Sequence, residues 1–354
     1  MKRFLALALA LIMVLSLAAC GSEPKAEAPA AEPAAQNEPA AEAVEAAEPV
    51  TIRFASNKAD NDPACTGFEA FKKYVEETSG GSIKVDIFYN STLYTDTDMI
   101  MAMSQGNCEM GVAGSDKAAV YIPAMNCLNM GYLFESPEHL FAVYESEIGQ
   151  NFSAQLVDEV GVRWAGLYYN GARTINLAMD KEILSPEDMK GVQMRMPNST
   201  AFVNLGMAMG CSPIAMDLSE VYTALQNGTV DGQDNPLPTI LANKYYEVTK
   251  SITLSKHIIS ENSVFFADEF YQSLSDEQRK IVDDGIKLLC ETSSNAIIET
   301  ENSCADELRG YGVTIYEPDI TQMREAVIAW YYDNPDSMSG WDLDILDQII
   351  NFEY

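Results

Sequence analysis

Apolar positions between residues 50 and 113 follow two different periods along the chain. Three short runs, in which apolar residues alternate with polar ones or follow one another, predict strands: 52–55, 83–87 and 110–113. Phe68, Phe71 and Val75 recur at three- and four-residue steps and predict a helix, and residues 99–104 predict another. Strands that alternate with helices in this way predict a parallel or mixed sheet covered by helices.

A second set of the same elements begins near residue 164. Four runs predict its strands: 164–169, 192–196, 229–231 and 253–259. Helical signals lie between them, with Ser185 as a cap before Pro186 and a further helix over residues 219–228. We interpret the last of the four strands as a hinge, in which His257 is a packing residue and not a ligand contact. The two sets predict two α/β lobes.

A long helix is predicted after the second set. A capping box at Ser275 and Gln278 starts an uninterrupted helical pattern of about 35 residues that extends to about Arg309. The mean globular helix has roughly 11–12 residues, so this one can lie across two lobes and brace both. The lobes that we predict comprise these segments: 50–170 with about 260–300, and 171–259 with about 301–354.

The N-terminus carries an export pattern. Two basic residues precede an almost wholly apolar run to Ala19, which is typical of a secretory signal and shorter than the roughly 20 residues that span a membrane. The following Cys20-Gly21 completes a segment that resembles the bacterial lipobox. We therefore predict a signal peptide over residues 1–19 and a lipid on Cys20. Plain cleavage after a small residue, or an uncleaved anchor, is the alternative.

Residues 20–49 are rich in Ala, Glu and Pro. They contain so little large apolar surface that burial cannot offset the entropy of ordering them. We interpret this segment as a tether, which prolines and like charges extend. Together with the anchor it predicts a folded part on the outer face of the bacterial cytoplasmic membrane or in the periplasm.

The formal net charge is −31, with 22 Lys and Arg against 53 Asp and Glu. Nucleic acid is excluded as a partner, because phosphate binding needs clustered cations. An anionic ligand could be held only by a few deliberately placed arginines.

Six cysteines follow Cys20, and none of them form a C-x-x-C pair, so a zinc knuckle or a thioredoxin-type centre is not supported. Cys290 and Cys304 fall on the predicted long helix, about 21 Å apart at 1.5 Å per residue, which is too far for a disulfide. Acidic doublets near residues 60 and 96 lack the spacing of a calcium loop. We expect buried free thiols, no metal and no cofactor.

Residues 210–236 carry the most specific motif in the chain. The segment reads Gly-x-x-Pro-x-x-Met and then Glu-Val-Tyr-x-Ala-Leu-Gln-x-Gly-x-Val-Asp-Gly-Gln-Asp-Asn-Pro. It resembles the signature of the solute-binding proteins of tripartite ATP-independent periplasmic (TRAP) transporters. Residues 185–197 resemble that family's D-x-K-G-x-K-x-R-x-P stretch, and a weaker likeness extends over essentially all of residues 51–354.

The resemblance implies an α/β fold, a two-lobed periplasmic-binding-protein-like clamp with hinge strands and a long lobe-spanning helix. The elements predicted above agree with it. It also implies that a small organic acid binds between the lobes, which close around it. The ligand would then pass to the small and large membrane subunits of an ion-gradient-driven TRAP permease. We expect the receptor to be a monomer.

Two arginines and an asparagine are the main site residues that the resemblance implies. Arg195 matches the family arginine that pairs with a ligand carboxylate, for which a rigid guanidinium fork is suited. Asn235 matches the amide that orients the ligand or this arginine, although an Asn before Pro236 also suits a turn. Arg173 resembles a second family arginine and lies 22 residues before the first. Taken alone, an arginine on a strand would indicate surface charge.

Four further contacts rest on the same resemblance. Asn198 follows the Arg-x-Pro run, and Leu218 takes the place of an apolar wall residue. Asn57 and Asp96 lie where first-lobe polar contacts occur, and either could instead cap a loop. Residues 114–115 are Gly-Ser, where sialic-acid-binding members carry a Glu, which argues against a sugar acid.

Three other functions fit less well. An exported enzyme lacks H-E-x-x-H and G-x-S-x-G motifs, and only His139 and His257 could serve as imidazole bases, so we predict no enzymatic activity. A receptor of an ATP-driven importer would lack the signature at residues 210–236. A ligand-sensing lipoprotein of the same fold, signalling to a membrane sensor, stays open as an alternative.

Overall fold

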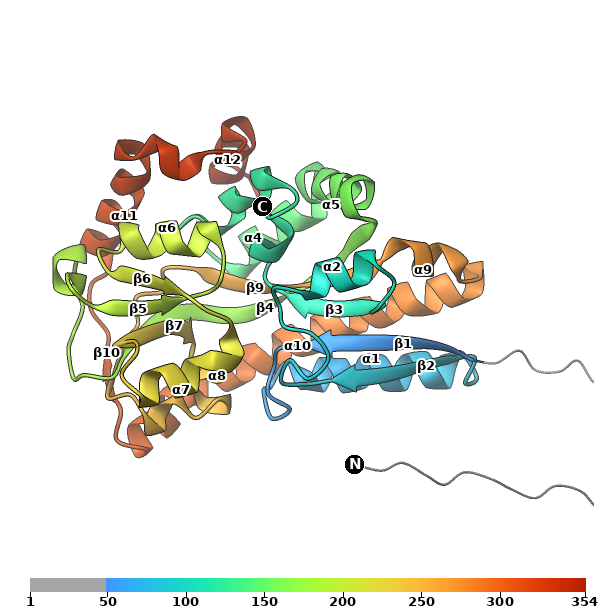
Figure 1. The fold of residues 1–354 in the computed structure, drawn as a ribbon, viewed down its shortest axis with the longest axis horizontal. Helices are drawn as coiled ribbons and strands as arrows, with labels where there is room; N and C mark the ends of the chain where they lie inside the picture. The colour runs from blue at the N-terminus through green and yellow to red at the C-terminus, as the bar shows by residue number, and fades with distance from the viewer. Residues whose placement is uncertain (1–48) are drawn as a thin grey trace, which may run out of the picture. The chain divides into compact units, whose positions relative to one another are not determined.

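The computed structural model describes residues 49–354. The predicted signal peptide, the lipidation site at Cys20 and all but the last residue of the predicted tether lie outside this range. In the described part, ten strands form one sheet with the order β2-β1-β3-β9-β4-β7-β5-β6, to which β8 and β10 are added beside β4 (Figure 1).

The first half of the sheet is mixed, as the sequence predicts. It contains these strands: β1 (Val50–Ser56), β2 (Ile83–Phe88), β3 (Met110–Ala113), the first part of β4 (Val162–Leu177) and β9 (Ile259–Ala267). β1 is parallel to β2 and β3, whereas β9 is antiparallel to β3 and β4. Helices α1 (Cys65–Thr78) and α10 (Asp276–Gly310) cover one face through a core that includes Phe68 and Phe71.

The other face of this half is covered by apolar side chains from short helices. These are α2 (Met99–Ser104), α3 (Ser115–Ala118), the 3-10 helix η1 (Pro123–Asn129), α4 (Pro137–Glu145) and α5 (Glu147–Val160). The helix α9 (Asp268–Ser273) follows β9. α2, β2 and β3 agree closely with the predicted elements.

The second half of the sheet uses the remaining strands: β5 (Gln193–Met196), β6 (Ser212–Ala215), β7 (Gly232–Pro236), β8 (Ser251–Thr253) and β10 (Thr314–Tyr316). Its helices are η2 (Pro186–Met189), α6 (Thr200–Ala208), η3 (Leu218–Glu220), α7 (Val221–Gln226), α8 (Leu237–Ala242) and η4 (Tyr245–Glu247). The chain ends with α11 (Thr321–Asp333), η5 (Pro335–Met338) and α12 (Leu343–Ile350). α11 contacts α6, and α12 contacts α4, where His139 Nε2 lies 2.9 Å from the Ile349 carbonyl oxygen.

Strand β4 joins the two halves because it is long enough to pair in both. Residues 162–172 pair with β9, and residues 173–177 pair with β7. A register shift between Tyr169 and Gly171 lies within the pairing with β9, just before the partner changes at Arg173. Gly171 has φ 104°, and a Cβ there would lie 2.6 Å from the Pro236 Cβ, so only glycine fits. The sequence predicted this strand only to residue 169, because Asn170-Gly171 is a turn signal that the sheet uses as a bulge.

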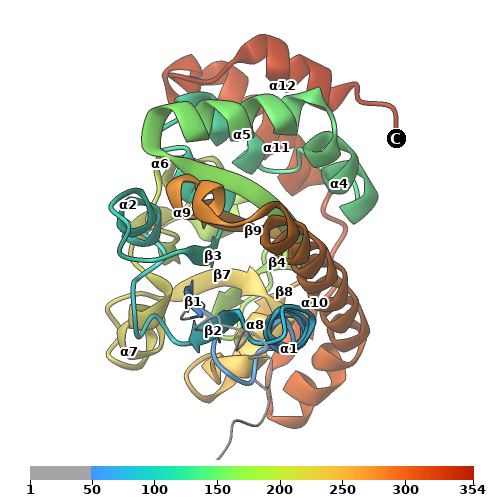
Figure 2. The same cartoon turned by 90° about the vertical axis from the view of Figure 1, so that its right-hand side faces the viewer.

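Helix α10 confirms the long helix predicted from the capping box. It spans 35 residues, and Ser275 Oγ accepts from the Gln278 backbone N–H. Its first turns pack against α1, with which it runs side by side in Figures 1 and 2. Its last turns place Cys304 and Leu308 in the core beneath α7 and α8. One helix therefore packs against both halves of the sheet.

Two predicted strands are wrong. The strand predicted at residues 229–231 starts later, at β7, because Gly232–Pro236 pairs in the middle of the sheet between β4 and β5. Backbone pairing there outweighs the turn preference of Gly-Gln-Asp-Asn-Pro. The strand predicted at residues 253–259 is mostly the connection between β8 and β9, and β4 is the strand that pairs in both halves of the sheet.

The six cysteines of the described range are all free, and Cys290 and Cys304 both lie on α10, as expected. No group of three or more His, Cys, Asp or Glu side chains within residues 49–354 could hold a metal ion. Over the same range, no helix is both long and apolar enough to cross a membrane.

Candidate functional site

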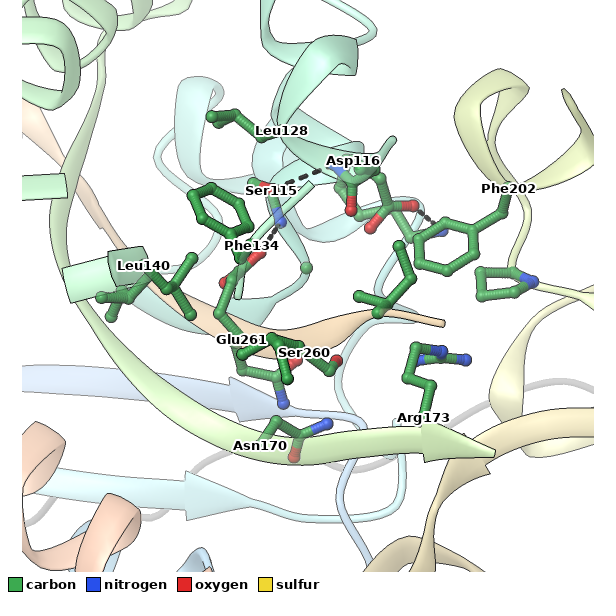
Figure 3. Close-up of a pocket in the computed structure, with 18 of the residues that line it drawn as sticks. Ser115, Asp116, Leu128, Phe134, Leu140, Asn170, Arg173, Phe202, Ser260 and Glu261 are labelled. Atoms are coloured by element: carbon green, nitrogen blue, oxygen red, sulfur yellow. Dashed lines mark hydrogen bonds and ion pairs between the residues drawn. The ribbon is translucent and has the colours of Figure 1, made fainter. Parts of the chain in front are cut away.

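A cavity lies where the two halves of the sheet meet (Figure 3). About 70 Å³ of it is open to the centres of water molecules, whereas one water needs roughly 10–15 Å³ on this measure, so a small solute fits. The cavity is lined by six of the seven predicted ligand contacts: Asn57, Asp96, Arg173, Arg195, Leu218 and Asn235. The seventh, Asn198, is exposed and does not line it.

Arg195 enters the cavity from β5, which lies between β6 and β7. Its side chain is 2% exposed, and its Nε and Nη2 both donate to the Met216 carbonyl oxygen, at 3.0 and 2.8 Å. No carboxylate of residues 49–354 lies within 4.0 Å of it. Burial lowers the pKa of Arg195. Because a buried cation without a counter-ion is costly, an anion in the cavity would be stabilised beside it.

Arg173, on β4, is already paired. Its Nε donates to Asp234 Oδ2 at 2.6 Å and its Nη2 to Oδ1 at 3.0 Å, and its guanidinium lies 4.9 Å from the Phe202 ring centroid. Burial favours a protonated Asp234, but the charge of Arg173 outweighs this, with help from His257, and the pKa of Asp234 is lowered. His257 Nε2 lies 3.2 Å from Asp234, outside the cavity lining, which agrees with a packing role. Arg173 therefore lines the cavity as a cation whose charge Asp234 largely neutralises.

Asn235 is held by a chain of amides along the central strands. Its Nδ2 donates to Gln233 Oε1 at 2.6 Å, and Gln233 Nε2 donates to Asn176 Oδ1 at 2.9 Å. Asn235 lies on a strand, so the turn considered for it is excluded. Nearby, Thr239 at the cavity wall has a buried hydroxyl without a partner in the described range. Both side chains line the same cavity as Arg195.

Asp96 and Lys117 face these residues from the first half of the sheet. Lys117 Nζ lies 3.1 Å from Asp116 Oδ2 and 3.8 Å from Asp96 Oδ2, and it donates to the Asn198 carbonyl oxygen at 3.0 Å. Within residues 49–354, Asp96 accepts no hydrogen bond, although it is only 7% exposed. Burial raises the pKa of Asp96. Asn198 thus joins the two halves of the molecule through its carbonyl oxygen, and its Nδ2 also donates to Thr97 Oγ1 at 3.5 Å.

Among the lining residues that sequence reasoning missed are Lys58, Asn170 and Glu261. Lys58 donates from Nζ to Asn170 Oδ1 and lies 3.6 Å from Asp62. Glu261 accepts from the Ser115 backbone N–H at 2.7 Å, and burial raises its pKa to about 7. A carboxylate therefore does lie beside Ser115, supplied by β9. The signal was present, since Glu261 is the only charged residue of an otherwise apolar and neutral-polar strand.

The sequence pattern of the bacterial extracellular solute-binding proteins, family 7, matches residues 54–334. The chain belongs to this family. The sialic acid-binding periplasmic protein SiaP of Vibrio cholerae is 30% identical over 257 residues, which cover 73% of this chain and 79% of that protein.

Two solved structures of TRAP periplasmic solute-binding proteins from Roseobacter denitrificans are similar. One, with bound 3-deoxy-D-manno-oct-2-ulosonic acid, gives a TM-score of 0.81 at 31% identity and covers 86% of this chain and 99% of that one. The other, with bound L-galactonate, gives 0.77 at 27% identity and covers 81% and 95%. These comparisons confirm the predicted two-lobed α/β clamp and the assignment to the TRAP solute-binding proteins.

Proposed function

We propose that this TRAP solute-binding protein captures a small carboxylate in the cavity, with the carboxylate on Arg195, and delivers it to a TRAP permease. The observation that carries the proposal is the charge of Arg195, which has no counter-ion among residues 49–354 and is buried in a cavity that both halves of the sheet line. A carboxylate would meet a guanidinium already held in place by Met216. The acids bound to the Roseobacter relatives support this ligand class.

The opposite wall supports a ligand that also donates hydrogen bonds. Asp96 and the Asn57 amide oxygen are acceptors that no donor of the described residues satisfies. A hydroxyl or amine on the ligand would satisfy them, whereas a second carboxylate would face Asp96 and be repelled. We therefore favour a hydroxylated or amino monocarboxylate over a dicarboxylate. The sequence argument against a sugar acid is weakened, because Glu261 places a carboxylate beside Ser115.

Capture by lobe closure completes the proposal. β4 and β9 would serve as the hinge, and a ligand that contacts both lobes would shift an open–closed equilibrium by its differential affinity. The lobes would follow the bounds drawn from the sequence, with residues 50–170 and about 260–300 moving against 171–259 and about 301–354. We further propose a monomer without enzymatic activity, lipid-anchored through Cys20 outside the cytoplasmic membrane.

The test is calorimetric titration of the purified protein with monocarboxylates that carry or lack hydroxyl groups. We expect Arg195→Ala to weaken binding of every acid by about 2–5 kcal/mol, or roughly 30- to 5,000-fold, because it removes the partner of a buried charge. Arg324→Ala, on the exposed surface, is the matched control and should leave affinity unchanged. Undiminished affinity in Arg195→Ala would refute the assignment.

Transport is tested separately, in vesicles that contain the permease subunits. We expect addition of the receptor to stimulate uptake of the acid that it binds. Binding without any stimulation of uptake would favour the alternative, a lipoprotein that reports the ligand to a membrane sensor.

A further inference from the structure

The cavity extends past its polar residues into an apolar chamber between β4 and the helices α4 and α5. The chamber is lined by Phe134, Leu140, Val143, Phe152, Trp164 and Leu167, all of which are buried. In Figure 3, Phe134 and Leu140 lie on one side of Ser260 and Glu261, and Arg173 and Phe202 lie on the other. The polar site and the chamber are therefore two ends of one continuous space.

Within the chamber, one polar group has no partner. The Trp164 side chain is 6% exposed, and its Nε1–H donates to no acceptor among residues 49–354. The backbone of Trp164 is satisfied, since its N–H donates to Ser153 Oγ and its carbonyl accepts from the same hydroxyl, both at 3.2 Å. Buried indole N–H groups usually find a partner. A ligand atom that accepts a hydrogen bond would supply one here.

The polar groups between the two ends of the cavity are hydrogen-bonded to one another. Glu261 accepts from the Ser115 backbone N–H at 2.7 Å and from Ser263 Oγ at 2.8 Å, and Asn129 donates to Ser115 Oγ at 3.1 Å. These groups satisfy one another, so they require no hydrogen bonds from the ligand. An apolar segment can pass them without leaving a polar group unpaired.

From these observations we propose that the chamber determines specificity by holding the apolar end of the ligand. The ligand is then an organic acid whose carboxylate contacts Arg195 and whose far end is an apolar chain or ring with one hydrogen-bond acceptor near Trp164. This inference rests on the proposed function and adds the part of the ligand that the polar residues do not specify. An apolar void that stayed empty would forfeit packing contacts, which a ligand tail restores.

The first test compares straight-chain 2-hydroxy acids of increasing length on the unaltered protein, from glycolate to 2-hydroxyoctanoate. We expect affinity to rise about fourfold for each methylene that enters the chamber, until the chamber is full. Affinity that stays level or falls with chain length would overturn the inference.

Two variants locate the effect. Val143→Phe fills the chamber and should abolish the gain with chain length. Val162→Phe adds the same bulk to the same apolar core away from the cavity, and should leave the gain intact. A gain that survives Val143→Phe would contradict the proposal. If that variant does not fold, the chain-length series and the following variant decide.

Trp164→Phe removes the N–H together with one of the two fused rings, and it keeps an aromatic side chain in the chamber wall. The lost ring should weaken all acids alike, and we expect a further loss of about 3- to 10-fold for acids with a terminal keto or methoxy group relative to their all-carbon analogues. Equal effects on both would show that Trp164 is packing alone. Arg195→Ala and the chain-length series test the two proposals separately. If Arg195→Ala binds all acids as tightly as the unaltered protein does, the proposed function fails. If Arg195→Ala loses binding, but the affinity of the unaltered protein does not depend on chain length, only the chamber proposal is overturned.

Discussion

Glu261 offers the sharpest test of the site, because its environment predicts how stability changes with pH. It lies on β9 between the two ends of the cavity, and both of its carboxyl oxygens accept hydrogen bonds, from the Ser115 backbone N–H and the Ser263 hydroxyl. Burial raises its pKa from 4.5 to about 7, more than these bonds lower it. Glu261→Gln keeps the shape of the side chain and one of its two acceptor oxygens, but it cannot ionise.

The sign follows from proton binding in the two states. Below pH 4.5 the carboxyl is protonated in both the folded and the unfolded chain, and stability is highest relative to the variant. Between 4.5 and about 7 the unfolded chain loses this proton while the folded chain keeps it, so stability falls as pH rises. Over that interval the wild type should lose about 3 kcal/mol relative to Glu261→Gln, at about 1.4 kcal/mol per pH unit.

The assay is urea denaturation of both proteins at half-unit steps from pH 4 to 8. The difference in unfolding free energy, and not either curve alone, isolates Glu261 from the other acids of the chain. Glu325→Gln, which removes an exposed carboxylate without a hydrogen bond in the described residues, is the control and should run parallel to the wild type. If the unfolding free energies of Glu261→Gln and the wild type change in parallel with pH, the raised pKa of Glu261 is refuted.

Two further predictions follow from the ion pairs around the cavity. Asp234→Asn leaves the buried charge of Arg173 without its counter-ion, and urea denaturation should show a loss of about 3–5 kcal/mol; a loss below 1 kcal/mol would contradict the pairing. Lys117→Met removes the bond to the Asn198 carbonyl oxygen, which is one of the hydrogen bonds that join the two halves. Small-angle scattering of the ligand-free variant should therefore show a larger radius of gyration than the wild type, and an unchanged radius would contradict this.

Local sequence signals predicted an element well where the residues that start and end it lie within the same segment. The capping box at Ser275 and the glycines after Arg309 bounded α10 to within about one residue. The sequence predicted the strand boundaries wrongly where pairing with strands distant along the chain sets them. Asn170-Gly171 carries a turn signal, yet β4 continues through it, because β9 pairs with the strand on both sides of a bulge there and β7 pairs with it from Arg173 onward. The same pairing makes Gly232–Pro236 a strand.

The site could be predicted from the sequence only for residues that lie in the segments resembling the family. Arg195 and Asn235 stand in the segments that resemble the family, and both line the cavity. The pairing of Arg173 with Asp234 joins residues 61 positions apart and depends on the geometry of two strands, which no local pattern encodes. Glu261 was missed because the strand predicted there ended at residue 259, whereas β9 begins at Ile259 and continues to Ala267.

The charges of the cavity also bear on which anion it can hold. Three of its four cations already have a carboxylate within 4.0 Å: Lys58 with Asp62, Lys117 with Asp116, and Arg173 with Asp234. Arg195 alone among the cations of the lining is left without one in the described range. One carboxylate neutralises it, whereas a second would add charge beside Asp96 and Glu261. The net charge of −31 acts mainly at the surface, where salt screens it over about 8 Å, so selection between mono- and dicarboxylates falls to these few buried groups.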